Sequence, residues 1–221
     1  MPALLLGSIS TIADTSELQR SAFNQAFVKH GLDWEWSQEE YRGLLTGNGG
    51  ADRIAAYARQ RGEQVDAAAV HQTKSEIFQR SLADGGVTTR PGVRESVAAA
   101  RDTGWAVGLV TTTSRANIDA LLAGLDDLGE ADFDIITDVT TVDSPKPSPD
   151  VYAAVLDELG EDADGSVAVE DNVGGVEAAT AAGLACVAFP NENTEDHDFG
   201  DVEVVASLDF AELRAAHEEA R

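Results

Sequence analysis

The chain has 221 residues, 43% of them hydrophobic, which is ordinary for a globular protein and enough for one large domain or a core with a smaller insert. Asp and Glu number 40 against 15 Lys and Arg, so the net charge is −25. A surface of this sign repels nucleic acids and anionic membranes, and we expect neither as a partner.

The cations are mostly Arg, since only three of them are Lys. An acidic surface that is poor in Lys suggests a halophilic protein, because high salt screens the repulsion between its carboxylates. The alternative is an acidic protein from an organism that lives at ordinary salinity.

Cysteine content and hydropathy indicate the compartment. Cys186 is the single cysteine, which excludes an internal disulfide and fits a reducing cytoplasm. No apolar run approaches the roughly 18 residues that a membrane-spanning helix needs, and no basic segment opens the chain. We therefore expect a cytoplasmic protein without a membrane span or signal peptide. We also expect a monomer.

Short apolar runs alternate with helical periodicity along most of the chain, which is typical of α/β folds. Helices are expected at about Val93–Arg101 and from near Arg115. The expected strands are Leu4–Ser8, Ala106–Thr111, Asp134–Thr137, Val167–Glu170, Ala185–Phe189 and Val202–Ala206. This alternation predicts a mostly parallel sheet with helices on both faces.

Residues 15–89 interrupt that alternation with helical patterns alone. The four expected helices are Glu17–His30, Gln38–Leu45, Ala51–Arg61 and Asp66–Leu82, with a Gly-rich connection at Thr46–Gly50. The predicted organisation is an α/β core of residues 1–14 and 90–221 with a helical cap inserted at 15–89. The polar, acidic stretch Asn191–Asp201 is expected to be a surface loop.

Polar residues follow the predicted second strand, where ligands bind in open parallel sheets. Thr111 stands at the strand tip, and the free backbone N–H groups of the next helix follow it. A hydroxyl and such amides together form a cradle for phosphate. The alternative is that Thr112, Thr113 and Ser114 serve only to cap the helix.

Two further strand ends carry charge. Lys146 lies between two prolines that restrict the backbone, and its ammonium is expected beside phosphate oxygens; the alternative is a solvated surface Lys. Glu170 and Asp171 are adjacent at the tip of the fourth strand. Two carboxylates placed there are costly without a cation, and Mg²⁺ accepts one or two carboxylates together with phosphate oxygens.

These segments resemble the haloacid dehalogenase (HAD) superfamily of hydrolases, in the subgroup of β-phosphoglucomutase and CbbY-like proteins. The resemblance rests on Thr111, on Lys-Pro-Ser-Pro at 146–149, on the run from Glu170 to Gly183 and on the cap helices. It implies a Rossmannoid core with an inserted helical cap of the C1 type. The implied activity is that of a Mg²⁺-dependent phosphatase or phosphomutase acting on a small phosphorylated metabolite.

The resemblance also implies roles for single residues. Thr111, Thr112 and Lys146 would bind phosphate, and Asp171 would ligate the metal directly or through water. Glu170 would orient the ligands, and Arg53 would contact substrate. The subgroup's cap loop carries a substrate-binding Lys where this chain has Ala51.

The first segment departs from the family pattern. The family has a nucleophilic Asp and an acid/base Asp two residues later, where this chain has Gly7 and Ile9. On a strand these two positions face the same side, with Ser8 facing away. Ser10 and Thr11 follow and offer hydroxyls or amides to an anion. Aspartyl-phosphate turnover is therefore expected to be absent or severely weakened, and Mg²⁺ affinity to be reduced.

Three functions remain open on this basis. The first is a protein that binds a phosphorylated ligand under the cap without turning it over. The second is an active hydrolase with an unconventional nucleophile. The third is a non-enzymatic scaffold or regulatory protein that uses the fold only as a framework.

Overall fold

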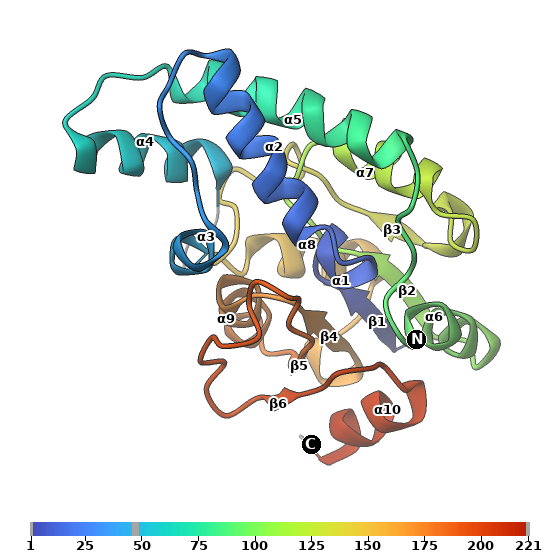
Figure 1. Cartoon of the computed structure of the whole chain (residues 1–221). Helices are drawn as coiled ribbons and strands as arrows, with labels where there is room; N and C mark the ends of the chain where they lie inside the picture. The colour runs from blue at the N-terminus through green and yellow to red at the C-terminus, as the bar shows by residue number, and fades with distance from the viewer. Residues whose placement is uncertain (1, 46–48, 220–221) are drawn as a thin grey trace.

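A parallel sheet forms the centre of the computed structural model, which describes residues 2–45 and 49–219 (Figure 1). Within these residues the strand order is β3-β2-β1-β4-β5-β6, with every pairing parallel, as predicted. The strands are β1 (Ala3–Leu6), β2 (Ala106–Leu109), β3 (Ile135–Ile136), β4 (Val167–Glu170), β5 (Ala185–Ala188) and β6 (Glu203–Val204). Most end one or two residues before the predicted limits.

Helices cover both faces of the sheet because each buried strand is apolar on both sides. Leu4 and Leu6 belong to the cluster that includes side chains of α6 (Val93–Asp102), α7 (Arg115–Gly124) and α10 (Phe210–Glu219). Ala3 and Leu5 point the other way and pack with α8 (Asp150–Leu159) and α9 (Val173–Ala181). The side-chain period of two thus assigns alternate residues to opposite layers.

All four predicted cap helices are present, within about two residues of the predicted limits. They are α2 (Ser16–Lys29), α3 (Gln38–Leu44), α4 (Gly50–Arg61) and α5 (Ala67–Ala83). Part of the predicted Gly-rich connection at 46–50 lies outside the described residues. In Figure 1 α5 runs beside α7 of the core, and one apolar cluster is continuous from the sheet into the cap.

The cap packs around aromatic side chains. Trp36 lies fully buried with its ring 4.7 Å from that of Phe27 and 4.9 Å from that of Phe23. Trp34 and Tyr41 join the same cluster. Aromatic pairs at such distances add to the free energy gained from burial. These rings therefore hold the cap together.

The chain after β1 does not continue as a strand. Residues Ile9–Ile12 form the short helix α1, and Ser8 is its N-cap, with its Oγ accepting a hydrogen bond from the Thr11 amide at 3.0 Å. The expected strand through Ser8 is therefore wrong at its end, because the Ser8 hydroxyl supports a helix start. Gly7 and Ile9 therefore do not lie on one strand, and the strand period of two does not set how they face the site.

The stretch after β5 also differs from expectation. Residues 191–201 contain no helix or strand, as predicted, but the first of them are not at the surface. Asn191, Asn193 and Thr194 are buried, with 4%, 0% and 1% of their surface exposed. Asn191 and Thr194 hydrogen-bond to the buried Asp171, and the Asn193 amide group donates to the half-buried Glu17, so each of these buried side chains has at least one hydrogen-bond partner.

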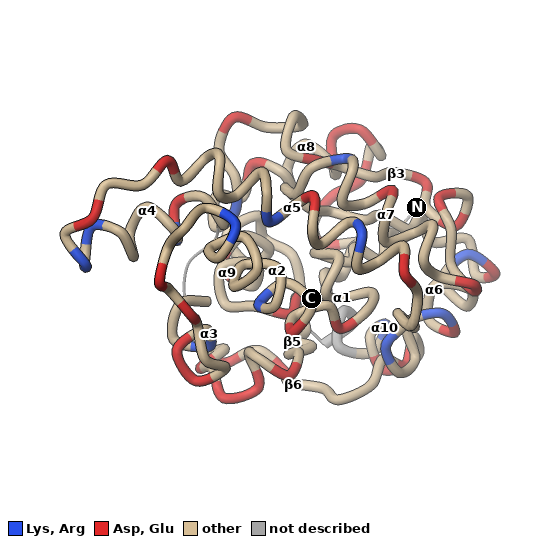
Figure 2. The backbone as a smooth tube through the Cα atoms, turned by 45° about the horizontal axis from the view of Figure 1, so that its top comes forward, with Lys and Arg blue, Asp and Glu red and all other residues tan. Residues whose placement is uncertain are grey.

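Acidic residues are distributed along most of the chain. Asp and Glu are spread over many helices and loops in Figure 2, with few Lys and Arg among them. Across the part of the chain that the structure describes, none of the helices combines the length and the apolar character needed to cross a bilayer.

Candidate functional site

The strand order reverses at β1, which has β2 on one side and β4 on the other. Connections that leave neighbouring strands in opposite directions open a crevice at the carboxyl edge of a parallel sheet. A pocket of about 690 Å³ lies there, lined by residues that follow β1, β2 and β4 and by cap residues of α2, α4 and α5. The sheet thus places the predicted site residues where the topology favours a ligand.

Most of the predicted site residues line this pocket. They are Gly7, Ile9, Ser10, Arg53, Thr111, Thr112, Lys146 and Asp171. Thr11 is fully buried with its amide bonded to Ser8, and Glu170 is fully buried behind the pocket wall. Neither of these two side chains lines the pocket.

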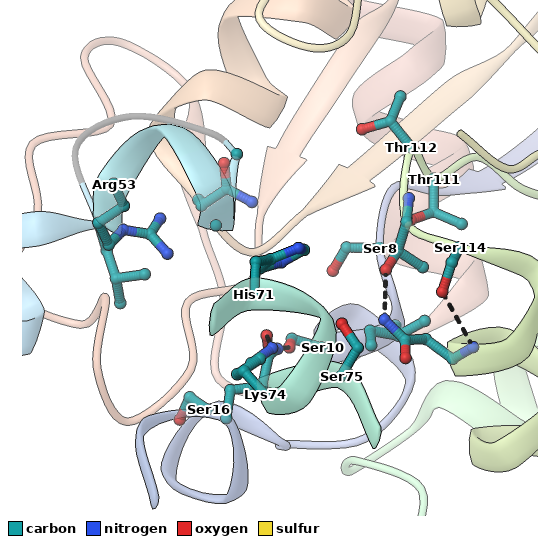
Figure 3. Close-up of a pocket in the computed structure, with 18 of the residues that line it drawn as sticks. Ser8, Ser10, Ser16, Arg53, His71, Lys74, Ser75, Thr111, Thr112 and Ser114 are labelled. Carbon is teal, nitrogen blue, oxygen red and sulfur yellow. Dashed lines mark hydrogen bonds between the residues drawn. The ribbon is translucent and has the colours of Figure 1, made fainter. Parts of the chain in front are cut away.

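Thr111 and Thr112 form one polar end of the pocket (Figure 3). The Thr111 amide donates to Thr137 Oγ1 at 2.9 Å, which holds the strand tip. Ser114 is the N-cap of α7, with its Oγ accepting from the Asn117 amide at 3.4 Å. The helix cap is therefore Ser114, which leaves the two Thr side chains at the pocket.

Lys146 lies beside Gly7 and is nearly buried, with 6% of its surface exposed. Its Nζ donates to the carbonyl oxygens of Gly7 at 2.6 Å and Val110 at 2.7 Å, and it lies 2.5 Å from Glu170 Oε1. An ammonium has three hydrogen-bond donors. These three acceptors use all three N–H donors of the ammonium. The expected contact with phosphate would therefore require Lys146 to give up one of these hydrogen bonds.

Glu170 is the buried partner of that lysine. Its Oε1 also accepts a hydrogen bond from the Tyr152 hydroxyl at 2.7 Å. Among the described residues, its Oε2 has no hydrogen-bond partner. Burial raises the pKa of the Glu170 carboxyl, and the Lys146 ammonium opposes that rise. The carboxylate therefore serves an internal ion pair rather than the pocket.

Asp171 faces the pocket but both of its oxygens have partners. Oδ1 accepts from Ser8 Oγ at 2.7 Å and from Asn172 Nδ2 at 3.0 Å, and Oδ2 accepts from Asn191 Nδ2 at 2.7 Å. The expectation that Ser8 faces away from the site is wrong, because the turn into α1 directs it to Asp171. Neither Ser8 nor Asn191 was identified from the sequence; the serine's potential as an N-cap was the available signal for Ser8.

The residues present offer Mg²⁺ fewer carboxylates than the family pattern implies. Gly7 has no side chain, and the Glu170 carboxylate is paired with Lys146. Of positions 7, 170 and 171, only Asp171 places a carboxylate at the pocket. Among the described side chains, no group of three or more His, Cys, Asp or Glu is placed to hold a metal ion. The expected Mg²⁺ therefore has a single carboxylate here, already bonded to three neutral donors.

The cap contributes basic side chains to the opposite side of the pocket, where Arg53, His71 and Lys74 lie (Figure 3). Lys74 is 4% exposed; its Nζ donates to Gln19 Oε1 at 2.9 Å and lies 4.8 Å from the Phe23 ring centroid. Burial, together with the nearby charge of Arg53, lowers the pKa of Lys74 to about 7. Lys74 was missed in the sequence because helical spacing alone does not show which face of α5 meets a ligand.

Arg53 occupies the predicted substrate-facing position and is held by its surroundings. Its Nε donates to the Leu44 carbonyl at 2.8 Å, and its guanidinium lies about 6 Å from the rings of Phe23 and Tyr41. Burial lowers the pKa of Arg53. Burial, together with the charges of Lys74 and Arg53, lowers the pKa of His71 to about 4.

Comparison with known proteins gives consistent results. Residues 10–189 match the family model of haloacid dehalogenase-like hydrolases. Protein CbbY of Cereibacter sphaeroides is 39% identical over 96% of this chain and 93% of its own length. The crystal structure of CbbY from Rhodobacter sphaeroides in complex with phosphate superposes with a TM-score of 0.87 at 36% identity, covering 99% of both chains. A mutant of that protein in complex with xylulose-(1,5)bisphosphate gives 0.86 at 37% identity, covering 96% of both chains.

Proposed function

The chain belongs to the haloacid dehalogenase-like hydrolases, and on this premise we propose that it binds a small phosphorylated sugar between the sheet and the cap without aspartyl-phosphate turnover. The observation that carries the proposal is the pairing of a pocket suited to anions with a glycine at position 7. The pocket supports binding of an anion, and the glycine removes the nucleophile that the family's covalent step requires.

The pocket supports a ligand with two anionic ends. Thr111 and Thr112 supply hydroxyls at the sheet side, and Lys74 and Arg53 supply positive charge at the cap side. Buried cations in a protein of net charge −25 are a local exception that attracts an anion. The related CbbY has been solved with phosphate, and a mutant of it with xylulose-(1,5)bisphosphate, a ligand with two phosphate groups.

The absent carboxylate argues against turnover. A covalent phosphoryl intermediate needs a nucleophile, and Gly7 has no side chain. Ile9 at the acid/base position is 5% exposed and apolar. Loss of general acid/base help alone costs about 10²–10⁴-fold in rate, whereas uncatalysed phosphate-monoester hydrolysis is among the slowest reactions known, with enzymic accelerations up to about 10²¹-fold. Binding groups alone leave most of that barrier in place.

A second candidate function rests on Ser8. Its hydroxyl lines the pocket and lies 2.7 Å from Asp171 Oδ1, the arrangement of a hydroxyl nucleophile beside a carboxylate base. The same hydroxyl accepts from the Thr11 amide as the cap of α1. As the alternative function, the contact between Ser8 and Asp171 favours an unconventional hydrolase over a pure scaffold.

Phosphate release from sugar mono- and bisphosphates, measured with Mg²⁺ in molar KCl, separates these functions. We expect the native chain to release phosphate no faster than Asp171→Asn. Turnover by the native chain that Ser8→Ala abolishes would establish the second candidate. Turnover that survives Ser8→Ala would refute the non-catalytic proposal.

Binding is tested separately by thermal shift with the same compounds. We expect a sugar bisphosphate to raise the melting temperature of the native chain, and Thr111→Val to remove most of the rise. Thr103→Val, at an exposed helix end away from the pocket, is the matched control. If no phosphorylated sugar shifts the native chain, the scaffold hypothesis is favoured instead.

A further inference from the structure

The space beside Gly7 is filled by a side chain from the neighbouring strand. A Cβ atom built on Gly7 would lie 2.1 Å from Glu170 Cδ and 2.2 Å from Glu170 Oε1. Real Cβ atoms do not approach other atoms this closely, so any side chain at position 7 displaces the carboxylate. The Glu170 carboxylate thus lies where a residue-7 side chain would begin.

Sheet register explains how β4 reaches this position. Leu6 of β1 pairs with Val169 of β4, and the Gly7 amide donates to the Val169 carbonyl at 2.8 Å. The next residues, Gly7 and Glu170, are therefore side by side on the α8/α9 face of the sheet. A glutamate on β4 is long enough to place its carboxylate over the Cα of its neighbour.

A second glycine on α9 completes the enclosure. A Cβ at Gly175 would lie 2.2 Å from both Glu170 Cδ and Glu170 Oε2. Neither Gly7 nor Gly175 has a positive φ, so both are required by close approach rather than by backbone conformation. The carboxylate is held between two glycines from different elements.

The pair with Lys146 shows what this carboxylate does. A nearly buried ammonium needs an anionic partner, because an unpaired charge in the interior is very costly. Glu170 is fully buried, lies 2.5 Å from Lys146 Nζ, and is fixed by the Tyr152 hydroxyl. Position 7 has no carboxylate to offer, although its carbonyl oxygen contacts the same ammonium.

We propose that Glu170 supplies from β4 the carboxylate that β1 lacks, so that positions 7 and 170 share one carboxylate place beside Lys146. Glu170 is a positioning residue: it holds the ammonium on the carbonyls of Gly7 and Val110 and keeps it from the ligand. This arrangement requires glycine at positions 7 and 175, because a Cβ atom at either would overlap the Glu170 carboxylate. The inference does not depend on the proposed function, since it concerns the pair whether or not the pocket is occupied.

Substitutions at positions 7 and 170, with the melting temperature measured in molar KCl, test the proposal that these positions share one carboxylate place. We expect Gly7→Ala to lower it by about 5 °C or more, because the Cβ displaces Glu170 and the lysine loses its partner. Gly43→Ala is the matched control, since a Cβ there meets nothing within 4 Å. Breaking the pair with Glu170→Gln, which keeps the shape, should lower it by about 10 °C.

Charge rescue distinguishes a shared carboxylate place from simple packing. We expect Gly7→Asp/Glu170→Ala to recover most of the stability lost in Glu170→Ala, because the carboxylate returns to Lys146 from β1. Gly7→Asn/Glu170→Ala, equal in shape but neutral, should recover little. Should Glu170→Ala fail to fold, recovery of a folded protein by the Asp variant alone gives the same answer.

The contrary outcomes are equally defined. If Gly7→Ala is as well tolerated as Gly43→Ala, position 7 does not depend on Glu170. If the Asp and Asn double variants are equally stable, the carboxylate at this place is not what Lys146 requires. Phosphate release and ligand-induced melting shifts are measured separately from the melting temperatures of these variants. The melting temperatures therefore remain interpretable even if the native chain turns out to hydrolyse phosphates or to bind no phosphorylated sugar.

Discussion

Lys74 is the residue whose ionisation is most sensitive to its surroundings in the pocket. It lies between the rings of Phe23 and Phe78, with Gln19 as its hydrogen-bond acceptor and the Arg53 charge nearby. Its pKa of about 7 lies below the ordinary value of 10.5, because burial disfavours the charged form. Protonated Lys74 therefore costs folded-state stability.

The pH dependence of stability follows from this shift. Between about pH 7 and about pH 10 the unfolded chain holds a proton on this lysine that the folded chain lacks, so stability rises with pH across that window. We expect the melting temperature of the native chain to rise relative to Lys74→Met as pH increases from 7 to 9.5. Lys29→Met, at an exposed site on α2, should not change the profile. Parallel profiles for native and Lys74→Met would contradict the shift.

At the scale of elements, the stretch after β5 supports the site rather than only connecting strands. Asn191 is 4% exposed and donates to Asp171 Oδ2 at 2.7 Å, and Asn193 Nδ2 donates to Glu17 of α2 at 2.8 Å. The Thr194 hydroxyl donates to the Asp171 carbonyl at 2.7 Å. This stretch therefore links the tip of β4 to the cap.

Removing one of these links has a definite cost. Asn191→Ala leaves a buried carboxylate oxygen without its donor, which costs about 2 kcal/mol and lowers the melting temperature by about 4–8 °C. Glu195→Ala, in the same stretch but with 58% of its side chain exposed, should change stability by less than about 0.5 kcal/mol. Equal melting temperatures for the two variants in thermal unfolding would show that Asp171 does not need Asn191.

For the whole molecule, the net charge of −25 sets the response to salt. Repulsion among carboxylates destabilises the compact state, and screening by salt reduces it. We expect the melting temperature to rise steadily between about 0.1 M and about 2 M KCl. An uncharged osmolyte at matched osmolality, which cannot screen charge, should give a smaller rise. A melting temperature independent of KCl would refute the halophilic interpretation.

Sequence patterns predicted the architecture well because they are local. The periods of strand and helix, together with the short motifs after each strand, indicated the parallel sheet, the four cap helices and the polar residues at the carboxyl edge. One error occurred where a side chain altered the local path: the Ser8 hydroxyl caps a helix, and strand β1 ends at Leu6. Another concerned the polar stretch after β5, whose first residues are buried through contacts with distant parts of the chain.

By itself the sequence determined the family, the α/β order of elements and the absence of a carboxylate at positions 7 and 9. Only the tertiary structure decided what replaces it, because Gly7 and Glu170 meet through strand pairing across 163 positions of the chain. The same holds for the bonds from Ser8 and Asn191 to Asp171. Close packing brings distant residues into contact, and no local pattern encodes which of them will share a buried charge.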